Sequence, residues 1–282
     1  MGLNTYVNFN GAIIRSDKAI LGADNRSFRY GDGLFETIRV AGDRLVLGDF
    51  HFERLLAGAA LLQFKLPSFF TVEKLTSQIL DLCKKNGHKR LSRVRLVIFR
   101  GDGGLYDPQN HFPNYIIQSW PLPGENERLN ENGLVIGLFP DGRKSCDRLA
   151  NLKSNNYLLY VLAALYAGQR QLNDCLVLNS QGRIADSTIS NLFWCRDGEI
   201  YTPPLSDGCV AGVMRRWLLE TLPKAGLPVQ EKETSPEDLE GAEEVFLTNA
   251  IHPIRWVKAF RGASFGTRLA TAIFNGHLPD TR

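Results

Sequence analysis

Three segments that lie far apart in the sequence carry groups suited to one kind of chemistry. Lys153 is a single lysine between the apolar Leu152 and the start of an expected helix. Asp186 ends an expected strand and precedes a loop of small polar residues. The run Gly212 to Arg215 opens a further helix, and the free backbone N–H groups of a helix start can hold a phosphate.

Together these groups match the needs of pyridoxal 5′-phosphate. A lysine forms an imine with the cofactor's aldehyde, an acid keeps the pyridine nitrogen protonated so that the ring withdraws electrons, and backbone amides hold the phosphate. The run Thr248-Asn249-Ala250, at the end of an expected strand, offers further backbone donors. Taken singly, each group has a commoner explanation, because a lysine near a helix start is usually solvated and an acid after a strand is usually a turn residue.

The elements that must position these groups begin with strands and two helices. Residues 7–46 predict short strands separated by glycine turns. Apolar residues at helical spacing predict helices over about 49–64 and 72–86. Residues 93–99 alternate as a strand, which places Arg93 and Arg95 on one face and the apolar side chains on the other.

A Pro/Gly/polar stretch then predicts a linker over 121–130, which separates a domain of residues 1–120 from one of residues 131–282. The second domain opens with a strand over 134–139 and has a helix over about 155–167. The further elements expected in it are strands over 174–179, 189–195 and 199–202, a helix over about 213–222, and a helix capped by Ser235.

Composition excludes several classes of protein. The 282 residues have 33 basic and 30 acidic side chains, and a net charge of +3 predicts no nucleic-acid partner. Five cysteines without a C-x-x-C pair, and histidines without i,i+4 spacing, predict neither a disulfide framework nor a metal site. The sequence shows neither a signal peptide nor an apolar run of about 18 residues, so we expect a cytoplasmic protein without a membrane span.

Over essentially its whole length the chain resembles the class IV, fold-type IV pyridoxal-phosphate family, which includes branched-chain and D-amino-acid aminotransferases and aminodeoxychorismate lyase. The matching segments, in order, are Asn8–Gly11, Arg29–Arg39, His51–Leu55, Leu152–Ser154, Asp186–Phe193, Gly212–Arg215 and Glu244–Ala250. The resemblance implies an α+β fold with a small N-terminal α/β domain and a larger C-terminal domain that has a β-barrel-like core. It also implies homodimers with active sites at the interface, where the Arg29–Phe35 loop reaches the partner's site.

By this resemblance Lys153 forms the Schiff base and carries the proton between Cα and C4′. The other residues assigned to the cofactor are Arg54 for the phosphate, Val213, Met214, Asn249 and Ala250 as mainly backbone donors, Tyr157, and Asp186. Tyr157 either lies near the ring or simply packs in its helix. Asp186 stands where the family usually has Glu, and a carboxylate one methylene shorter must approach the pyridine nitrogen by a backbone shift or through a water.

The residues expected at the substrate are Arg95, Phe35, Thr37 and Arg29, with Arg143 as a weaker candidate. Arg95 matches a pocket-facing arginine of the family and either binds a carboxylate through paired hydrogen bonds or forms a structural ion pair. The carboxylate trap of the D-amino-acid enzymes is absent, because Leu105 and Asp107 occupy its positions.

We expect an aminotransferase that moves an amino group between an amino acid and a 2-oxo acid. The alternative is 4-amino-4-deoxychorismate lyase, which releases 4-aminobenzoate and pyruvate. Thr37 favours the lyase, since branched-chain enzymes tend to have Gly at that position, as do Gly103-Gly104 and the run Asn191 to Trp194. A non-enzymatic cofactor-binding homologue is a third possibility, and the intact Lys153 argues against it.

Overall fold

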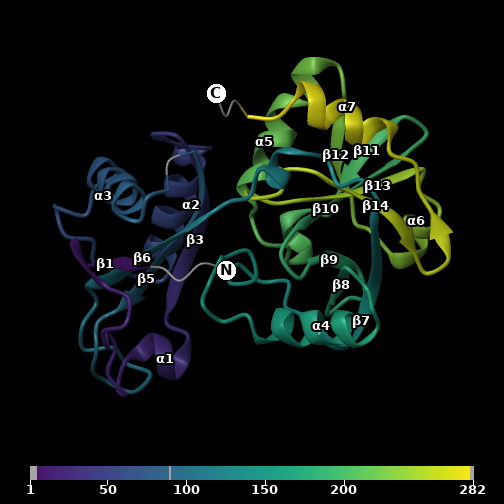
Figure 1. The fold of residues 1–282 in the computed structure, drawn as a ribbon. Coiled ribbons are helices and arrows are strands. Elements are labelled where there is room, and N and C mark those ends of the chain that lie inside the picture. The colour runs from purple at the N-terminus through teal and green to yellow at the C-terminus, as the bar shows by residue number, and fades with distance from the viewer. Residues whose placement is uncertain (1–4, 89, 280–282) are drawn as a thin grey trace. The chain divides into compact units, whose positions relative to one another are not determined.

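A computed structural model describes residues 5–88 and 90–279, and Figure 1 follows its ribbon along the chain. The described chain folds into two compact units. Residues 5–125 and 153–156 form the first, and residues 126–152 and 157–279 form the second. The four residues from Lys153 to Asn156 therefore belong to the N-terminal unit, although the chain on both sides of them belongs to the other. Within the described residues, no helix has the length and hydropathy needed to cross a membrane.

The first unit is built on an antiparallel sheet of six strands in the order β2-β1-β6-β5-β3-β4. Its strands are β1 (Tyr6–Phe9), β2 (Ala12–Arg15), β3 (Gly33–Ala41), β4 (Arg44–Leu45), β5 (Leu91–Arg100) and β6 (Pro113–Pro121). Strand β5 is interior, with β3 on one side and β6 on the other. As the sequence predicted, the apolar face of β5 is fully buried, whereas Arg93 and Arg95 lie on its opposite face.

Both predicted helices of this unit are confirmed as α2 (Gly48–Leu61) and α3 (Val72–Lys85). Helix α2 packs against β3, and α3 packs against β6 and β1. Thr71 caps α3 by accepting a hydrogen bond from the backbone of Lys74. The elements predicted from the sequence did not include β6 or the short helix α1 (Arg26–Tyr30), whose first turn is capped by Asn25.

The second unit is built on a mixed, curled sheet in the order β12-β11-β10-β13-β14-β7-β8-β9, with β15 paired to β14. Its strands are β7 (Leu134–Lys144), β8 (Asp174–Asn179), β9 (Ile184–Ser187), β10 (Asn191–Arg196), β11 (Glu199–Thr202), β12 (Val229–Glu231), β13 (Glu244–Thr248), β14 (Arg255–Phe260) and β15 (Ala263–Ser264). The sheet curls far enough for the edge strand β9 to contact β10. The α+β prediction with a barrel-like second core is thus confirmed. Trp194, Leu247 and Phe260 lie in its buried centre.

The helices of the second unit are α4 (Leu158–Gln169), α5 (Val213–Thr221), α6 (Pro236–Glu240) and α7 (Arg268–Gly276). Ser235 forms the capping box of α6 that the sequence predicted, whereas α7 was not anticipated. Helix α4 begins at residue 158 rather than the predicted 155. The reason is that residues 153–155 are extended and bond to β3, as described below.

Candidate active site

Lys153 lies in an extended segment that is bonded to the start of β3. The Lys153 carbonyl accepts a hydrogen bond of 2.9 Å from Phe35 N, and Asn155 N donates one of 2.9 Å to Gly33 O. Gly33 permits this close approach, since a Cβ there would lie 2.4 Å from Ile98 O and 2.6 Å from Asn155 Nδ2. The backbone that carries the lysine is therefore fixed by strand pairing.

The face of the sheet next to this segment carries three of the residues predicted for the substrate. In the β3–β5 register Thr37 lies opposite Arg95, and Phe35, two residues away, is on the same face as Thr37. The Phe35 ring centre lies 4.5 Å from Lys153 Nζ and 3.8 Å from the Arg95 guanidinium carbon. The structure thus brings Lys153, Phe35, Arg95 and Thr37 together; their roles remain predictions.

On the opposite face of β3 a buried ionic cluster supports Arg54. Arg54 donates to both carboxylate oxygens of Glu36, through Nε at 2.8 Å and a terminal nitrogen at 2.5 Å. His51 Nδ1 lies 2.6 Å from Glu36 Oε2, and its ring is completely buried. Glu36, which had no predicted role, therefore fixes the position of the Arg54 guanidinium, which is predicted to bind phosphate.

The pKa values in this cluster follow from burial and charge. Burial alone would raise the pKa of Glu36, but Arg54 and His51 more than offset it and lower that pKa to about 2. Burial lowers the pKa of His51, and the nearby Lys153 ammonium acts in the same direction. At neutral pH the cluster therefore has a carboxylate, a guanidinium and a neutral imidazole that donates from Nδ1.

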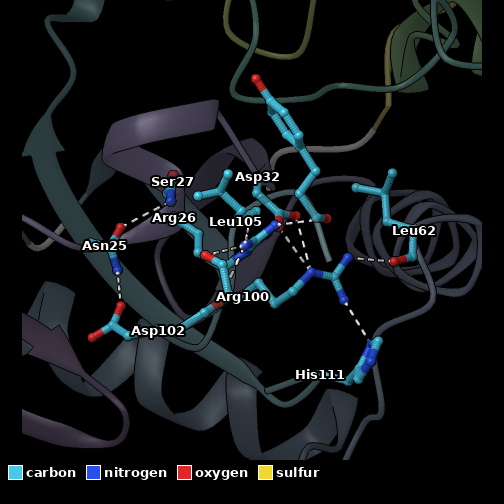
Figure 2. Close-up of polar contacts among 12 residues, drawn as sticks. Asn25, Arg26, Ser27, Asp32, Leu62, Arg100, Asp102, Leu105 and His111 are labelled. Carbon is cyan, nitrogen blue, oxygen red and sulfur yellow. Dashed lines mark hydrogen bonds and ion pairs between the residues drawn. The ribbon is translucent and has the colours of Figure 1, made fainter. Parts of the chain in front are cut away.

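The segment that leads into β3 is anchored by a second buried network, which Figure 2 shows. Asp32 accepts hydrogen bonds from Arg26 Nε at 2.9 Å and Arg100 Nε at 3.0 Å. Arg26 also donates to the carbonyls of residues 103–106, and Arg100 donates to Leu62 O at 2.5 Å. Both arginines thereby hold Asp32 in the loop before Phe35, and Arg26 also fixes the loop over 101–106.

Arg29, predicted at the substrate, lies on α1 within the anchored loop. Its guanidinium is 41% exposed and 3.4 Å from Asp24, and it is also stacked over Tyr30. None of these contacts links it to Phe35 or Arg95, so its assignment stays a prediction from the resemblance. Arg143, the weaker candidate, donates to the carbonyls of Pro140 and Gly142.

In the second unit Asp186 is a buried carboxylate with three donors. It lies in β9, its side chain is 3% exposed, and Val210 N donates to Oδ2 at 2.9 Å. Lys144 Nζ lies 3.0 Å from Oδ2, and the Tyr160 hydroxyl donates to both oxygens, at 2.9 and 3.1 Å. Asp186 is therefore not an exposed turn residue. The tyrosine at this carboxylate is Tyr160, whereas Tyr157 is the partly exposed residue that precedes α4.

The start of α5 lies beside Asp186 and forms an anion cradle. Asn191 Nδ2 donates to Val210 O at 2.8 Å, and a Cβ on Gly212 would lie 1.9 Å from Asn191 Oδ1. No side chain among the described residues caps α5, so its first backbone N–H groups are available to an anion. Val213 and Met214, which begin the helix, are both buried.

The third predicted phosphate segment joins the same region. Thr248 pairs with Asn191, and the Asn249 side chain donates to Ser190 Oγ at 3.0 Å. Asn249 Oδ1 in turn accepts from the backbone of Ile251 and His252, which shapes the turn after Ala250. The segments predicted to hold the ring nitrogen and the phosphate are thus neighbours in the second unit.

These residues fit pyridoxal phosphate. The uncapped start of α5 offers backbone amides for the phosphate dianion. The buried Asp186 has one oxygen, Oδ1, that accepts only the longer hydrogen bond from Tyr160 among the described residues. Lys153 supplies an amine on a fixed backbone. Arg54 was predicted, but its partners Glu36 and His51 were missed, although an acid in a strand followed by a His-x-x-Arg helix was a usable signal.

Residues 33–260 match the model of the family described as amino-transferase class IV. The chain is 34% identical over 230 residues to aminodeoxychorismate lyase of Vibrio harveyi, covering 80% of this chain and 82% of that protein. It is 30% identical over 268 residues to aminodeoxychorismate lyase of Bacillus subtilis, covering 93% and 89%. The crystal structure of the branched-chain amino acid aminotransferase of Escherichia coli superposes with a TM-score of 0.86 at 25% identity, covering 99% and 96%.

This chain therefore belongs to the class IV aminotransferase family. Family membership confirms the resemblance drawn from the motifs, the fold class, and pyridoxal phosphate as the cofactor. The reported relatives include both lyases and an aminotransferase, so the reaction is a separate question.

Proposed function

We propose that this enzyme cleaves aminodeoxychorismate into 4-aminobenzoate and pyruvate, with Lys153 as the residue that binds pyridoxal phosphate and moves the Cα proton. When bound, the cofactor withdraws electrons from the Cα of an attached substrate amine. The observation that carries the proposal is the position of Thr37. Its side chain shares a sheet face with Phe35 and lies opposite Arg95, and Phe35 and Arg95 form one cluster with Lys153.

The side chains of this cluster suit each part of the reaction. The Lys153 amine accepts the proton that leaves Cα. Arg95 presents a planar guanidinium that binds a substrate carboxylate through two parallel hydrogen bonds. The Thr37 hydroxyl is a donor for the ether oxygen, which leaves with the C–O bonding electrons as the enol form of pyruvate. A glycine at position 37 would supply no such donor.

The relatives support the same choice. The two reported relatives that are at least 30% identical are both named aminodeoxychorismate lyase, and each match covers at least 80% of both chains. An aminotransferase is the second candidate, favoured by the likeness to the Escherichia coli branched-chain enzyme over 99% of this chain. Both reactions begin with loss of the Cα proton. They differ because the aminotransferase must return that proton to C4′.

A product assay separates the two candidates. The holoenzyme is given aminodeoxychorismate, and pyruvate and 4-aminobenzoate are measured; in parallel it is given L- and D-amino acids with 2-oxo acids. The proposal predicts pyruvate and 4-aminobenzoate in equal amounts, and a Thr37→Val variant that loses this activity while Thr37→Ser retains most of it. New amino acids formed from 2-oxo acids, without pyruvate from aminodeoxychorismate, would instead identify an aminotransferase.

We also propose a homodimer, on the evidence of an apolar row on α4. Leu158, Val161, Leu162 and Leu165 recur at i, i+3, i+4 and i+7, and each is between 44% and 67% exposed. An apolar row of this size on one helix is typical of a surface that is covered by another protein chain. A second copy of this chain is the partner that the family resemblance implies.

A further inference from the structure

Lys144 is a buried lysine whose only acidic partner among the described residues is Asp186. It ends β7, its side chain is 7% exposed, and Nζ lies 3.0 Å from Asp186 Oδ2. A lysine is almost never this buried unless an acid pairs with it, because taking the ammonium out of water is costly. Because a buried ion pair contributes little to the stability of a fold, the Lys144–Asp186 pair points to a role other than stability.

Tyr160 completes a triad with this pair. Lys144 Nζ donates to the Tyr160 hydroxyl at 2.5 Å, and the hydroxyl donates to Asp186. Burial and the neighbouring carboxylate raise the pKa of Tyr160 well above its usual value, so the hydroxyl keeps its proton and remains a donor. Tyr160 therefore accepts a hydrogen bond from Lys144 and donates a second, fixed hydrogen bond to the carboxylate.

The remaining titratable group that faces Asp186 adds no charge. Cys209 lies just before Val210, and burial raises the pKa of its thiol to about 12, with Asp186 acting in the same direction. Lys144 from β7, Tyr160 from α4 and neutral Cys209 are thus the titratable groups around the carboxylate among the described residues. Among the described residues that contact this carboxylate, Lys144 is the one that brings a positive charge.

The two oxygens of Asp186 are used unequally. Among the described residues, Oδ2 accepts from Lys144, Tyr160 and Val210 N, whereas Oδ1 accepts only from Tyr160 at 3.1 Å. An ammonium on Oδ2 stabilises the negative form of Asp186 more than it repels a proton shared with a donor at Oδ1. The reason is that Lys144 Nζ lies 3.0 Å from Oδ2, whereas a donor bound at Oδ1 would be farther from the ammonium.

We propose that Lys144 and Tyr160 are positioning residues that keep Asp186 in its carboxylate form and leave its Oδ1 for the pyridine nitrogen of the cofactor. The part of this inference that concerns the charge of Asp186 stands on the triad alone. The part that concerns the pyridine nitrogen rests on the cofactor-binding role given to Asp186 above. Two measurements separate the parts.

The first measurement uses the protein without cofactor. Difference infrared spectra of Lys144→Met against the parent, at neutral pH, should show the C=O band of one protonated carboxyl group per chain. The band should be absent from Lys144→Arg and from the double variant Lys144→Met/Asp186→Asn. Lys232→Met, which removes a lysine that lies over Trp194 instead, is the matched control and should show no band. Absence of the band from Lys144→Met would overturn the charge role of Lys144.

The second measurement uses cofactor labelled with ¹⁵N at the pyridine nitrogen. The nitrogen resonance should lie at the protonated position in the parent, move toward the unprotonated position in Lys144→Met, and return in Lys144→Arg. Tyr160→Phe should give a smaller shift in the same direction, and Tyr166→Phe on the same helix should give none. A resonance that is the same in the parent and Lys144→Met would overturn the link to the cofactor. Failure of the parent itself to bind cofactor would instead count against the proposed function.

Folding provides a further check, because Lys144→Met leaves a buried carboxylate without its cation. The double variant removes both charges and should fold about as well as the parent, since replacing a buried ion pair with neutral groups costs little. If Lys144→Met fails to fold and the double variant folds, charge compensation is supported. If both fail alike, Lys144 serves the fold through its packing, and the proposal is wrong.

Discussion

The Arg95 guanidinium lies over the Phe35 ring, with its carbon 3.8 Å from the ring centre, and Lys153 Nζ lies 4.5 Å from the same ring centre. One aromatic side chain thus places both cations of the cluster, and a cation over a ring face is stabilised by the electrons of that face. Phe35 is itself fixed by its backbone hydrogen bond to Lys153 O. The amine and the guanidinium therefore share one aromatic ring whose backbone is bonded to the lysine segment.

Replacing Arg95 should damage catalysis without releasing the cofactor. We expect Arg95→Leu to lower kcat/KM for carboxylate substrates by roughly 10- to 150-fold, the range for one charge-assisted contact, while the visible absorbance of the bound cofactor is unchanged. Arg95→Lys should recover only part of the loss, because an ammonium lacks the planar pair of donors. Steady-state kinetics and absorbance spectra check this.

A substrate that lacks a carboxylate is the control for Arg95. The rate at which a simple primary amine changes the cofactor spectrum should be nearly equal in Arg95→Leu and the parent. Arg15→Leu, which removes an exposed arginine of the same unit, should leave both rates unaltered. Equal losses with the amine and with carboxylate substrates would mean that Arg95 supports the fold or the cofactor.

Glu36 should make stability depend on pH. Its pKa is about 2 in the folded chain against 4.5 for an ordinary glutamate. A carboxyl whose folded pKa is depressed stabilises the fold above its unfolded pKa, and this contribution is lost as the pH falls from 4.5 toward 2. For this shift the contribution at neutral pH is on the order of 3 kcal/mol.

We therefore expect Glu36→Gln to lower the free energy of unfolding strongly at neutral pH and progressively less as the medium is acidified. Urea titrations at a series of pH values measure the difference between variant and parent. Asp17→Asn is the matched control, because Asp17 also pairs with an arginine but is exposed, and it should change stability little at any pH. A deficit for Glu36→Gln that stays constant down to the acid limit would contradict the ionic role of Glu36.

Gly212 should be intolerant of even one methyl group, for reasons of space. A Cβ there would meet Asn191 Oδ1 at 1.9 Å, so Gly212→Ala must displace the side chain that holds Val210 O. Loss of one hydrogen bond of this kind predicts cofactor binding weaker by roughly fivefold or more. Equilibrium dialysis measures it, with Gly168→Ala as the control, because nothing lies within 4 Å of a Cβ at that position. Unaltered affinity in Gly212→Ala would remove the α5 start from the cofactor site.

The apolar row on α4 predicts the oligomeric state. Light scattering at micromolar concentration should give about twice the 31.6 kDa of one chain for the parent. Leu162→Lys/Leu165→Lys places two charges in the row and should give the monomer mass, because burying unpaired ammonium groups is costly. Leu21→Lys, at an exposed leucine outside the row, should remain dimeric. A fully active monomeric parent would refute the dimer.

The sequence predicted the elements whose patterns are local and periodic. Helix α3 and strand β5 follow from apolar residues repeated at helical and alternating spacing, and both lie where that spacing placed them. The start of α4 was misplaced because its signal is not local. Residues 153–155 have a helix-compatible sequence, but bonds to β3, more than 100 residues earlier, hold them extended.

The residues of the candidate site likewise divide into those that a sequence motif marks and those that no local signal marks. Lys153 and Asp186 were identified because the motifs around them resemble a known family. Lys144 and Tyr160 were not, since they reach Asp186 across 42 and 26 residues of sequence and no repeat marks them. Strand β6 was missed for a different reason, because its sequence does have a usable pattern. Tyr115, Ile117 and Ser119 alternate inward.

Lys153 is the residue that we propose binds the cofactor. The most direct test is reduction of the purified yellow protein with borohydride, followed by peptide mass spectrometry. We expect the cofactor to become fixed to the peptide that contains Lys153, and Lys153→Ala not to be labelled. Lys65→Ala, at an exposed lysine of the same unit, should be labelled like the parent. A Lys153→Ala protein that still traps the cofactor in the parent's amount would contradict the account.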